Sequence, residues 1–363
     1  MSIKFWGACI SGNLELAKTL DIPEFIKYSN LISEVYKAGH IEVAKWLVHL
    51  YSDEYKLFIN ACKDGVIELA KYILSINPHI ATSKYIIQQA FKYACREQHI
   101  DVAKWIFSIN QTAISENKDM SSVFSIANME IAQWIYSINR YIDISYDDNK
   151  ALTNSCGQNN IEYVKWILSI HTNIETIYFK VAFQNACKYG NIDIAKYLLS
   201  INDNKFLIYY ESFFNACSNG HLEMAKWLLS INPKINTTYN RCDGNDPAFQ
   251  YACANGYIDV AIWLYSINPN INVSATDEYA FRKACQNKHI DVAKWLLSIK
   301  PDINISILDE YIFKHACIFG NIDIAKWLYS IKPKINISSD NEYAFRGGHV
   351  KLIILMLQNG FYL

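Results

Sequence analysis

Three cysteine–histidine pairs are the first candidates for chemistry in this sequence. In each pair the two residues are four apart: Cys95/His99, Cys217/His221 and Cys285/His289. Thiolate and imidazole are common zinc ligands, so one such pair could supply half of a tetrahedral site. A structural zinc ion needs four ligands, and no second pair lies close by in the sequence. We therefore predict that each Cys packs in a core, that each His lies at a helix start, and that there is no metal site.

The cysteines recur at one position of a longer repeated pattern. One cysteine, Cys242, falls outside this pattern, in a predicted loop. A disulfide framework would need paired cysteines, whereas one Cys per repeat is typical of a small buried hydrophobic residue in a reducing compartment. The recurring cysteines are Cys9, Cys62, Cys95, Cys156, Cys187, Cys217, Cys253, Cys285 and Cys317.

Tryptophan and phenylalanine recur in the same way. An aromatic ladder could form a binding site, but regular repetition is more typical of core packing. We expect both series to fill the interior or the backing surface of the fold. The Trp series is Trp46, Trp105, Trp134, Trp166, Trp227, Trp263, Trp295 and Trp327, and the Phe series is Phe58, Phe91, Phe183, Phe213, Phe249, Phe281 and Phe313.

Motifs of known catalytic classes are missing from the sequence. It contains no H-E-x-x-H, G-x-x-x-x-G-K, G-x-G-x-x-G or G-x-S-x-G. Glycosylation sequons begin at Asn236, Asn272, Asn304 and Asn336, but the N-terminus lacks the features of a signal peptide, so we interpret them as coincidental. These observations predict a protein that is not an enzyme and that holds no cofactor.

The repeated pattern predicts a unit of helix, tight turn, helix and loop. In the first helix, Phe281, Ala284 and Cys285 share one face. An anchor residue follows, usually Gly, where a left-handed conformation is needed between the helices. The anchors lie near residues 12, 39, 65, 98, 127, 159, 190, 220, 256, 288, 320 and 348, and the last repeat is shortened.

The second helix carries three further local signals. The residue after the anchor is mostly His or Asn, which we expect to cap this helix. An acidic residue in the first turn is followed three positions later by Lys, as in Glu42/Lys45 and Asp291/Lys294, and we expect ion pairs there. The helix ends at Asn or Lys, often before Pro, and we expect a left-handed conformation at that residue.

Composition narrows the classes of partner. The chain has 363 residues, 51% hydrophobic residues and a formal net charge of −1. This balance gives no electrostatic footprint for nucleic acid or for an acidic membrane. No apolar run approaches the length of a membrane span. We therefore predict a monomeric cytoplasmic protein without a signal peptide or transmembrane segment, and with neither nucleic acid nor membrane as partner.

The repeat resembles the ankyrin repeat. The family pattern G-H-L-E-V-V-K-L-L-L-x-x-G-A-D-V-N aligns without gaps to Lys288–Asn304, which reads K-H-I-D-V-A-K-W-L-L-S-I-K-P-D-I-N. Where the family has Thr-Pro-Leu-His, residues 279–282 read Tyr-Ala-Phe-Arg, and Asp277 replaces the Gly that opens the loop. This variant closely resembles ankyrin proteins of giant DNA viruses of the mimivirus type.

The resemblance implies an all-α fold, an α-solenoid of about twelve stacked ankyrin helix-turn-helix repeats that forms a single domain over residues 1–363. In ankyrin proteins, partners contact the loop tips and the concave face of the first helices. It thus implies a non-catalytic scaffold that binds a protein partner on the concave face. If the protein is viral, that partner would be a host protein in the host cytoplasm.

The two residues after each Cys vary most between the units, and we predict that they contact the partner. Ile318, Phe319 and Tyr189 are the best candidates, because they are apolar or aromatic at positions expected to be exposed. Neutral drift at exposed sites would give the same variation. Two further alternatives are a substrate adaptor for a ubiquitin ligase and a drifting repeat paralogue without a specific partner. The candidate residues are Lys63, Asp64, Arg96, Glu97, Lys188, Tyr189, Ser218, Asn219, Gln286, Asn287, Ile318 and Phe319.

Overall fold

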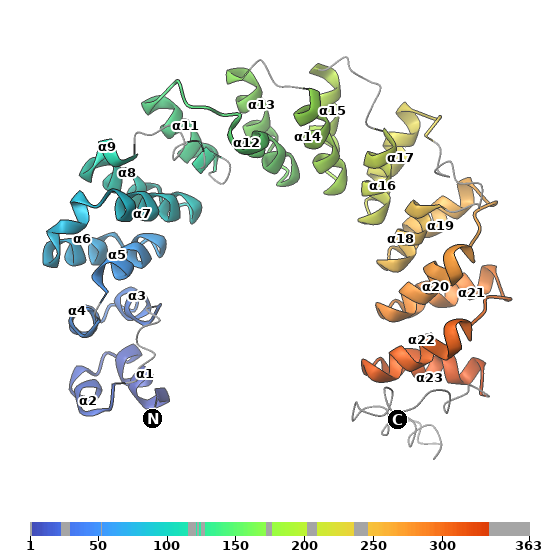
Figure 1. The fold of residues 1–363 in the computed structure, drawn as a ribbon, viewed down its shortest axis with the longest axis horizontal. Coiled ribbons are helices and arrows are strands. Elements are labelled where there is room, and N and C mark those ends of the chain that lie inside the picture. Colours follow the sequence, from blue (N-terminus) through green and yellow to red (C-terminus); the bar gives the residue numbers. More distant parts are fainter. Residues whose placement is uncertain are drawn as a thin grey trace. The chain divides into compact units, whose positions relative to one another are not determined.

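The computed structural model describes residues 2–22, 30–51, 53–114, 121, 123–124, 128–171, 176–201, 209–235 and 246–333. Within these ranges the chain is helical and contains no strand (Figure 1). No helix in these ranges has the length and apolar character that a membrane crossing requires. The anchors Ala127 and Gly348, the loop cysteine Cys242 and the shortened last repeat lie outside the described residues.

The chain divides into two units, Met1–Asn154 with Lys165–Ile174, and Ser155–Val164 with Glu175–Leu363. The first unit holds α1 (Ser2–Ile10), α2 (Leu14–Thr19), α3 (Asn30–Lys37), α4 (Ile41–Leu50), α5 (Glu54–Lys63), α6 (Ile67–Ile76), η2 (Pro78–Thr82), α7 (Lys84–Arg96), α8 (Ile100–Ile109), α9 (Gln111–Ile114) and α11 (Met129–Ile138). Helices α12 (Tyr146–Gly157) and α13 (Ile161–Ile170) contribute to both units.

The second unit continues with regular helix pairs. Each first helix packs against the second helix of its own repeat and against the first helix of the next repeat (Figure 1). This arrangement confirms the predicted helix-turn-helix repeats and the all-α fold. The helices are α14 (Thr176–Lys188), α15 (Ile192–Ile201), α16 (Tyr209–Ser218), α17 (Leu222–Ile231), α18 (Pro247–Ala254), α19 (Ile258–Ile267), α20 (Ala275–Gln286), α21 (Ile290–Ile299), α22 (Ile307–Ile318) and α23 (Ile322–Ile331).

The anchor residues adopt the conformation that the sequence predicts. All ten anchors within the described residues have positive φ, including the non-glycine residues Gln98, Asn159 and Lys288 at 67°, 59° and 71°. A left-handed residue lets the chain leave one helix and enter the next with few residues. The tight turn between the two helices of each repeat is therefore confirmed.

Phenylalanine and tryptophan join neighbouring repeats along what we call the aromatic seam. A Phe of one first helix contacts the Trp of the next repeat's second helix, with ring centroids 6.1 Å apart for Phe281/Trp327 and 6.0 Å for Phe249/Trp295. The Phe rings are fully buried and the Trp rings are half-buried. The same contact recurs as Phe5/Trp46, Phe58/Trp105, Phe91/Trp134, Phe183/Trp227 and Phe213/Trp263.

Phe and Trp are also replaced together along the sequence. Where Ile32 or Leu152 stands at the Phe position, the following repeat carries Tyr72 or Tyr197 at the Trp position. In the repeat whose Cys position is occupied by Phe124, that ring contacts Trp166 instead, nearly parallel at 16°. The aromatic residues thus have a packing role, as predicted.

A second inter-repeat contact involves the residue after the anchor, and it corrects a prediction. His40, His99, His221 and His289 form no side-chain cap on the helices that they precede. Their rings lie instead over the glycine anchor of the preceding repeat. A Cβ atom on Gly256 would be only 2.4 Å from Nδ1 of His289. Only a glycine leaves room for the ring, so the predicted histidine caps are wrong.

Where the anchor of the preceding repeat has a side chain, the residue after the next anchor is Asn and not His. Residues Asn128, Asn191 and Asn321 follow repeats whose anchors are Gln98, Asn159 and Lys288. Asn191 Nδ2 donates to the carbonyl of Cys156 at 2.7 Å, and so holds the end of the preceding first helix. Asn13, Asn128 and Asn160 do cap their helices, because their Oδ1 atoms accept from Leu16 N, Ile131 N and Tyr163 N at 3.0, 2.9 and 3.0 Å.

The ends of the second helices correct another prediction. Asn232, Asn268 and Lys300 have φ near −138° to −140°, not the left-handed conformation expected. The following Pro disfavours the helical region for the residue before it, which explains the extended backbone. Asn232 Oδ1 then accepts from Lys234 N at 3.2 Å, which turns the chain into the loop.

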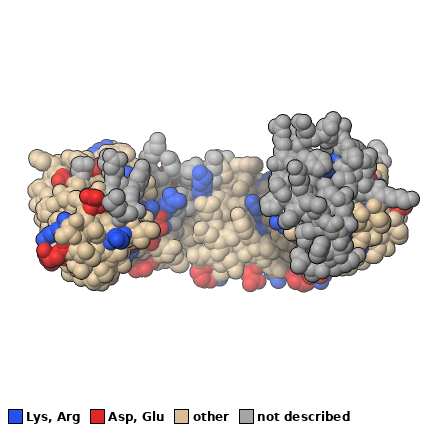
Figure 2. Space-filling view, turned by 90° about the horizontal axis from the view of Figure 1, so that it is seen from below, with Lys and Arg blue, Asp and Glu red and all other residues tan. Residues whose placement is uncertain are grey.

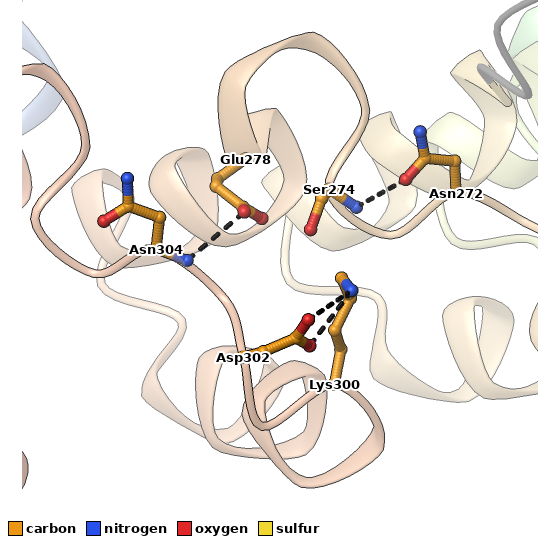
Figure 3. Close-up of polar contacts among 6 residues, drawn as sticks. All are labelled: Asn272, Ser274, Glu278, Lys300, Asp302 and Asn304. Carbon is orange, nitrogen blue, oxygen red and sulfur yellow. Dashed lines mark hydrogen bonds and ion pairs between the residues drawn. The ribbon is translucent and has the colours of Figure 1, made fainter.

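The loops between repeats are held by polar contacts (Figure 3). Asn272 Oδ1 accepts from Ser274 N at 3.1 Å, and Lys300 pairs with Asp302 at 3.0 Å. Asn304 N donates to Glu278 Oε1 at 3.2 Å, so the loop after α21 is tied to the start of α20. Asp277 stands where the ankyrin pattern has Gly, and it has φ of 55° in a kink near the start of α20 that also includes Thr276 and Glu278. This kink therefore has a glycine-like conformation without glycine.

The nine recurring cysteines are buried and free, as predicted. Burial raises the pKa of Cys9 to about 11 and that of Cys317 to about 12. These thiols are protonated at neutral pH and are therefore poor nucleophiles. Within the described ranges, no group of three or more His, Cys, Asp or Glu residues is placed to hold a metal ion.

Candidate protein-binding surface

The candidate residues lie where each first helix enters the tight turn. Phe319 and Tyr189 are 63% and 53% exposed, which is large for aromatic rings. Lys63, Arg96, Glu97, Lys188 and Asn287 are also exposed, whereas Asp64, Asn219, Gln286 and Ile318 are half-buried. The structure thus places eleven of the twelve candidates at least partly at the surface, on what we call the first-helix face.

Ser218 is the exception, and its expected exposure is wrong. Ser218 is only 7% exposed. Its Oγ donates to the carbonyl of Asn215 at 3.3 Å, and its own carbonyl accepts from Asn255 Nδ2 of the next repeat at 2.8 Å. Ser218 therefore joins repeats. Asn287 Nδ2 makes the corresponding bond to the carbonyl of Ala254 at 2.7 Å, although Asn287 is exposed.

An aromatic strip that the sequence reading missed crosses three first helices. Phe214, Tyr251 and Tyr279 come from α16, α18 and α20, with ring centroids 5.4 Å and 5.9 Å apart in succession. Tyr251 is 42% exposed. The three residues occupy different positions relative to their anchors, so no single repeat position marks them. In the sequence, only the number of aromatic residues in the predicted first helices could have indicated this strip.

A second aromatic group runs along α22. Tyr311, His315 and Phe319 are spaced by four residues and so share one side of the helix. The ring centroids of His315 and Phe319 are 4.3 Å apart, and those of Tyr311 and His315 are 5.9 Å apart. Burial, followed by the charge of Lys283, lowers the pKa of His315, so its imidazole is neutral at pH 7. This second group is therefore aromatic and uncharged at neutral pH.

Cations on the first-helix face lie over tyrosine rings. Lys188 Nζ is 5.4 Å from the ring centroid of Tyr189, and Arg282 Cζ is 5.8 Å from that of Tyr279. In the first unit, Lys63 Nζ lies 6.0 Å from the ring centroid of Tyr93. None of these three cations has an ion-pair partner among the residues that the structure describes. Arg282 Nε also donates to the carbonyl oxygen of Asp277 at 3.3 Å, so this side chain is held in place on the face.

On the second helices, the recurring Lys follows an acidic residue by three positions. Lys71 pairs with Glu68 at 2.7 Å and Lys226 with Glu223 at 2.8 Å, which confirms the expected pairs where the acid is Glu. No such pair forms between Asp193 and Lys196, between Asp291 and Lys294, or between Asp323 and Lys326, all of which are described. Asp is one methylene shorter than Glu, which accounts for the difference. The expected pairs are therefore wrong where the acid is Asp.

The net charge of the chain is near zero, but charged side chains are distributed differently on the first and the second helices of the second unit. On the first helices of the second unit, the described exposed or half-buried cations are Lys180, Lys188, Arg282, Lys283 and Lys314, and the anions are Glu211 and Asp277. On its second helices, the cations are Lys196, Lys226, Lys294 and Lys326, and the anions are Asp193, Glu223, Asp259, Asp291 and Asp323. In Figure 2, acidic and basic side chains are mixed along the lower edge of the view, and side chains of both kinds also lie above it. Glu278 on α20 and Glu310 on α22 are buried, so among the described exposed and half-buried side chains the first helices of this unit carry more cations than anions.

The family model described as "Ankyrin repeats (3 copies)" matches residues 186–277 and 213–309. These residues carry the aromatic strip. Among solved structures, the crystal structure of the human ASB11 ankyrin repeat domain is similar, with 18% identity over 56% of this chain and 96% of that chain, and a TM-score of 0.40. No curated protein matches the sequence.

Proposed function

We propose that this chain, whose residues 186–309 match the ankyrin-repeat family model, is a non-catalytic scaffold that binds a partner protein on its first-helix face. The single observation that carries this proposal is the set of exposed rings on that face. Tyr189 and Phe319 are largely exposed, whereas the recurring Phe rings are buried and the recurring Trp rings are half-buried. Exposed apolar groups rimmed by polar residues are typical of protein-interaction surfaces.

The division of labour within each repeat supports the same proposal. Recurring residues form the aromatic seam and the contacts between rings and glycine anchors, whereas residues on the first-helix face differ from repeat to repeat. Stacked repeats generally use such a face as an extended binding surface. We further propose that the repeats form one continuous stack of about twelve over residues 1–363, so that this face is the concave face predicted from the sequence.

A host protein as the partner is a narrower form of the proposal. It rests on the resemblance to giant-virus ankyrin proteins and on the heavy use of Ile, Asn, Lys and Tyr, whose codons are AT-rich. The adaptor role would require a ligase subunit in the bound complex. A drifting paralogue would bind no partner at all, and so the identity of the proteins cross-linked in the following experiment separates the three hypotheses.

Site-specific cross-linking tests the proposed face. A photo-reactive phenylalanine analogue is placed at Tyr189 or at Phe319, and a matched control carries it at Ile262, which is 43% exposed on the second helix α19. After irradiation in a lysate of the cells in which the protein occurs, we expect cross-links from Tyr189 and Phe319 but not from Ile262. Equal cross-linking at all three positions, or none, would contradict the proposal.

A further inference from the structure

Two positive charges on the first-helix face of the second unit lie against aromatic rings. Lys188 and Arg282 lie over tyrosine rings, and neither has an ion-pair partner among the described residues. A cation over an aromatic ring is held in place but keeps its net charge. Lys180 is only loosely neutralised, at 3.8 Å from Glu211. Lys188 and Arg282 are therefore positions at which carboxylate groups of a partner can pair with this face.

Apolar surface lies beside these charges. Ile177 on α14 is 52% exposed, and it shares one side of that helix with Val181 and Lys188. On the next first helices the aromatic strip is exposed at Tyr251, and on α22 Phe319 is exposed beside His315. Removing such groups from water gains about 25 cal/mol per Å² of apolar area. A partner must therefore bring apolar side chains as well as negative charge.

We infer that the first-helix face of the second unit binds an acidic protein segment that also carries apolar or aromatic side chains. This inference rests on the proposed function and adds the chemistry of the partner. Carboxylates of the segment pair with Lys188 and Arg282, and its apolar side chains cover Tyr251, Ile177 and Phe319. Complementary charge sets the orientation and the rate of binding, while ring burial supplies most of the affinity.

Single-stranded nucleic acid is the other class of ligand that combines negative charge with stacking groups. Two observations favour a protein segment. The rings of Phe214 and Tyr251 meet nearly edge to face at 78°, so they do not form a row of parallel platforms for bases. Aliphatic groups such as Ile177 and Val181 have no stacking role, but they do fit apolar side chains.

The test uses the full chain and four fluorescent probes. The first is a peptide of Glu, Leu and Tyr, and the second replaces each Glu with Lys. The third replaces each Leu and Tyr with Ser, and the fourth is oligo-dT. We expect the first peptide alone to bind with measurable affinity in fluorescence anisotropy, and we expect this binding to weaken as salt rises. Binding of the Lys peptide, or of the Ser peptide with equal affinity, would overturn the inference.

Paired variants show whether the named residues are responsible. Lys188→Gln with Arg282→Gln should weaken binding of the acidic peptide by roughly tenfold. Lys196→Gln with Lys294→Gln removes the same charge from exposed positions on second helices of the same unit, and should leave the affinity nearly unchanged. Equal loss in both pairs would mean that attraction is general and not located on this face.

The outcomes separate this inference from the proposed function. If the acidic peptide does not bind but Tyr189 and Phe319 still cross-link to a protein, the scaffold role stands and the chemistry assigned to the partner is wrong. If oligo-dT binds and the acidic peptide does not, the face binds nucleic acid and the inference fails. If the peptide does not bind and no cross-link forms, both proposals fail.

Discussion

The contacts between repeats and the first-helix face are built on the same helices, yet they use aromatic residues in different ways. In the aromatic seam, rings recur at fixed positions and are covered, as Phe281 is by its neighbours and Trp327. On the first-helix face, rings such as Tyr251 and Phe319 stand at irregular positions and are exposed. In this chain, residues that recur from repeat to repeat hold the structure together, whereas residues that differ between repeats are the candidates for function.

The largest effect that would test this distinction is the loss of a ring from the seam. Phe281 is fully buried, so Phe281→Ala should destabilise its repeats by about 3–5 kcal/mol. Phe319→Ala removes the same ring from an exposed position and should cost less than about 1 kcal/mol. Denaturant unfolding of both variants measures the difference. Similar losses in the two variants would show that the seam and the face are not distinct.

A buried carboxyl group inside the stack gives the next prediction. Asp246 caps α18, because its Oδ1 accepts from Phe249 N at 3.0 Å, while its Oδ2 has no partner among the described residues. Burial raises its pKa from 3.8 to about 6, in spite of the hydrogen bonds from Phe249 and Ala248 that lower it. Between these two values the unfolded chain has released a proton that the folded chain still holds. Stability therefore falls as pH rises from about 4 to 6.

Asp246→Asn should remove this cost and keep the cap. The difference between the two pKa values corresponds to roughly 3 kcal/mol above pH 6. We expect the variant to melt at a higher temperature than the parent protein at pH 7.5, with the gain disappearing near pH 4. Asp53→Asn is the matched control, because Asp53 caps α5 from an exposed position and should give no such gain. An unchanged or lower melting temperature for Asp246→Asn at pH 7.5 would contradict the account.

The contact between His289 and Gly256 gives a smaller, coupled effect. Gly256→Ala adds a Cβ atom against the imidazole at a residue with φ of 83°, and should cost about 2 kcal/mol. Replacing His289 with Asn, the residue found after side-chain-bearing anchors, should recover part of this loss. A double-mutant cycle measures the coupling. Additive effects of the two substitutions would show that the ring and the glycine are independent.

The sequence predicted those features that depend on short-range rules. The anchors Gln98 and Lys288 were identified at left-handed positions without being glycine, because the turn length and the flanking helices require that conformation. The buried cysteines and the packing role of Phe281 followed from their regular spacing. These features repeat because each unit must solve the same packing problem with its neighbours.

Predictions failed where a residue's role is set by a neighbouring repeat. His289 was expected to cap its own helix, but Gly256 of the preceding repeat leaves room for the ring. Ser218 was expected at the surface, but Asn255 of the next repeat covers its carbonyl group. The strip of Phe214, Tyr251 and Tyr279 was missed because its members come together only when three helices are stacked.

The central claim is that the exposed rings bind a partner without holding the stack together. The most direct measurement compares Ile318→Ala/Phe319→Ala with the parent protein, both for binding of the acidic apolar peptide and for thermal unfolding. We predict clearly weaker binding with a nearly unchanged melting temperature. A large fall in melting temperature with unchanged binding would contradict the claim and assign both side chains to the core.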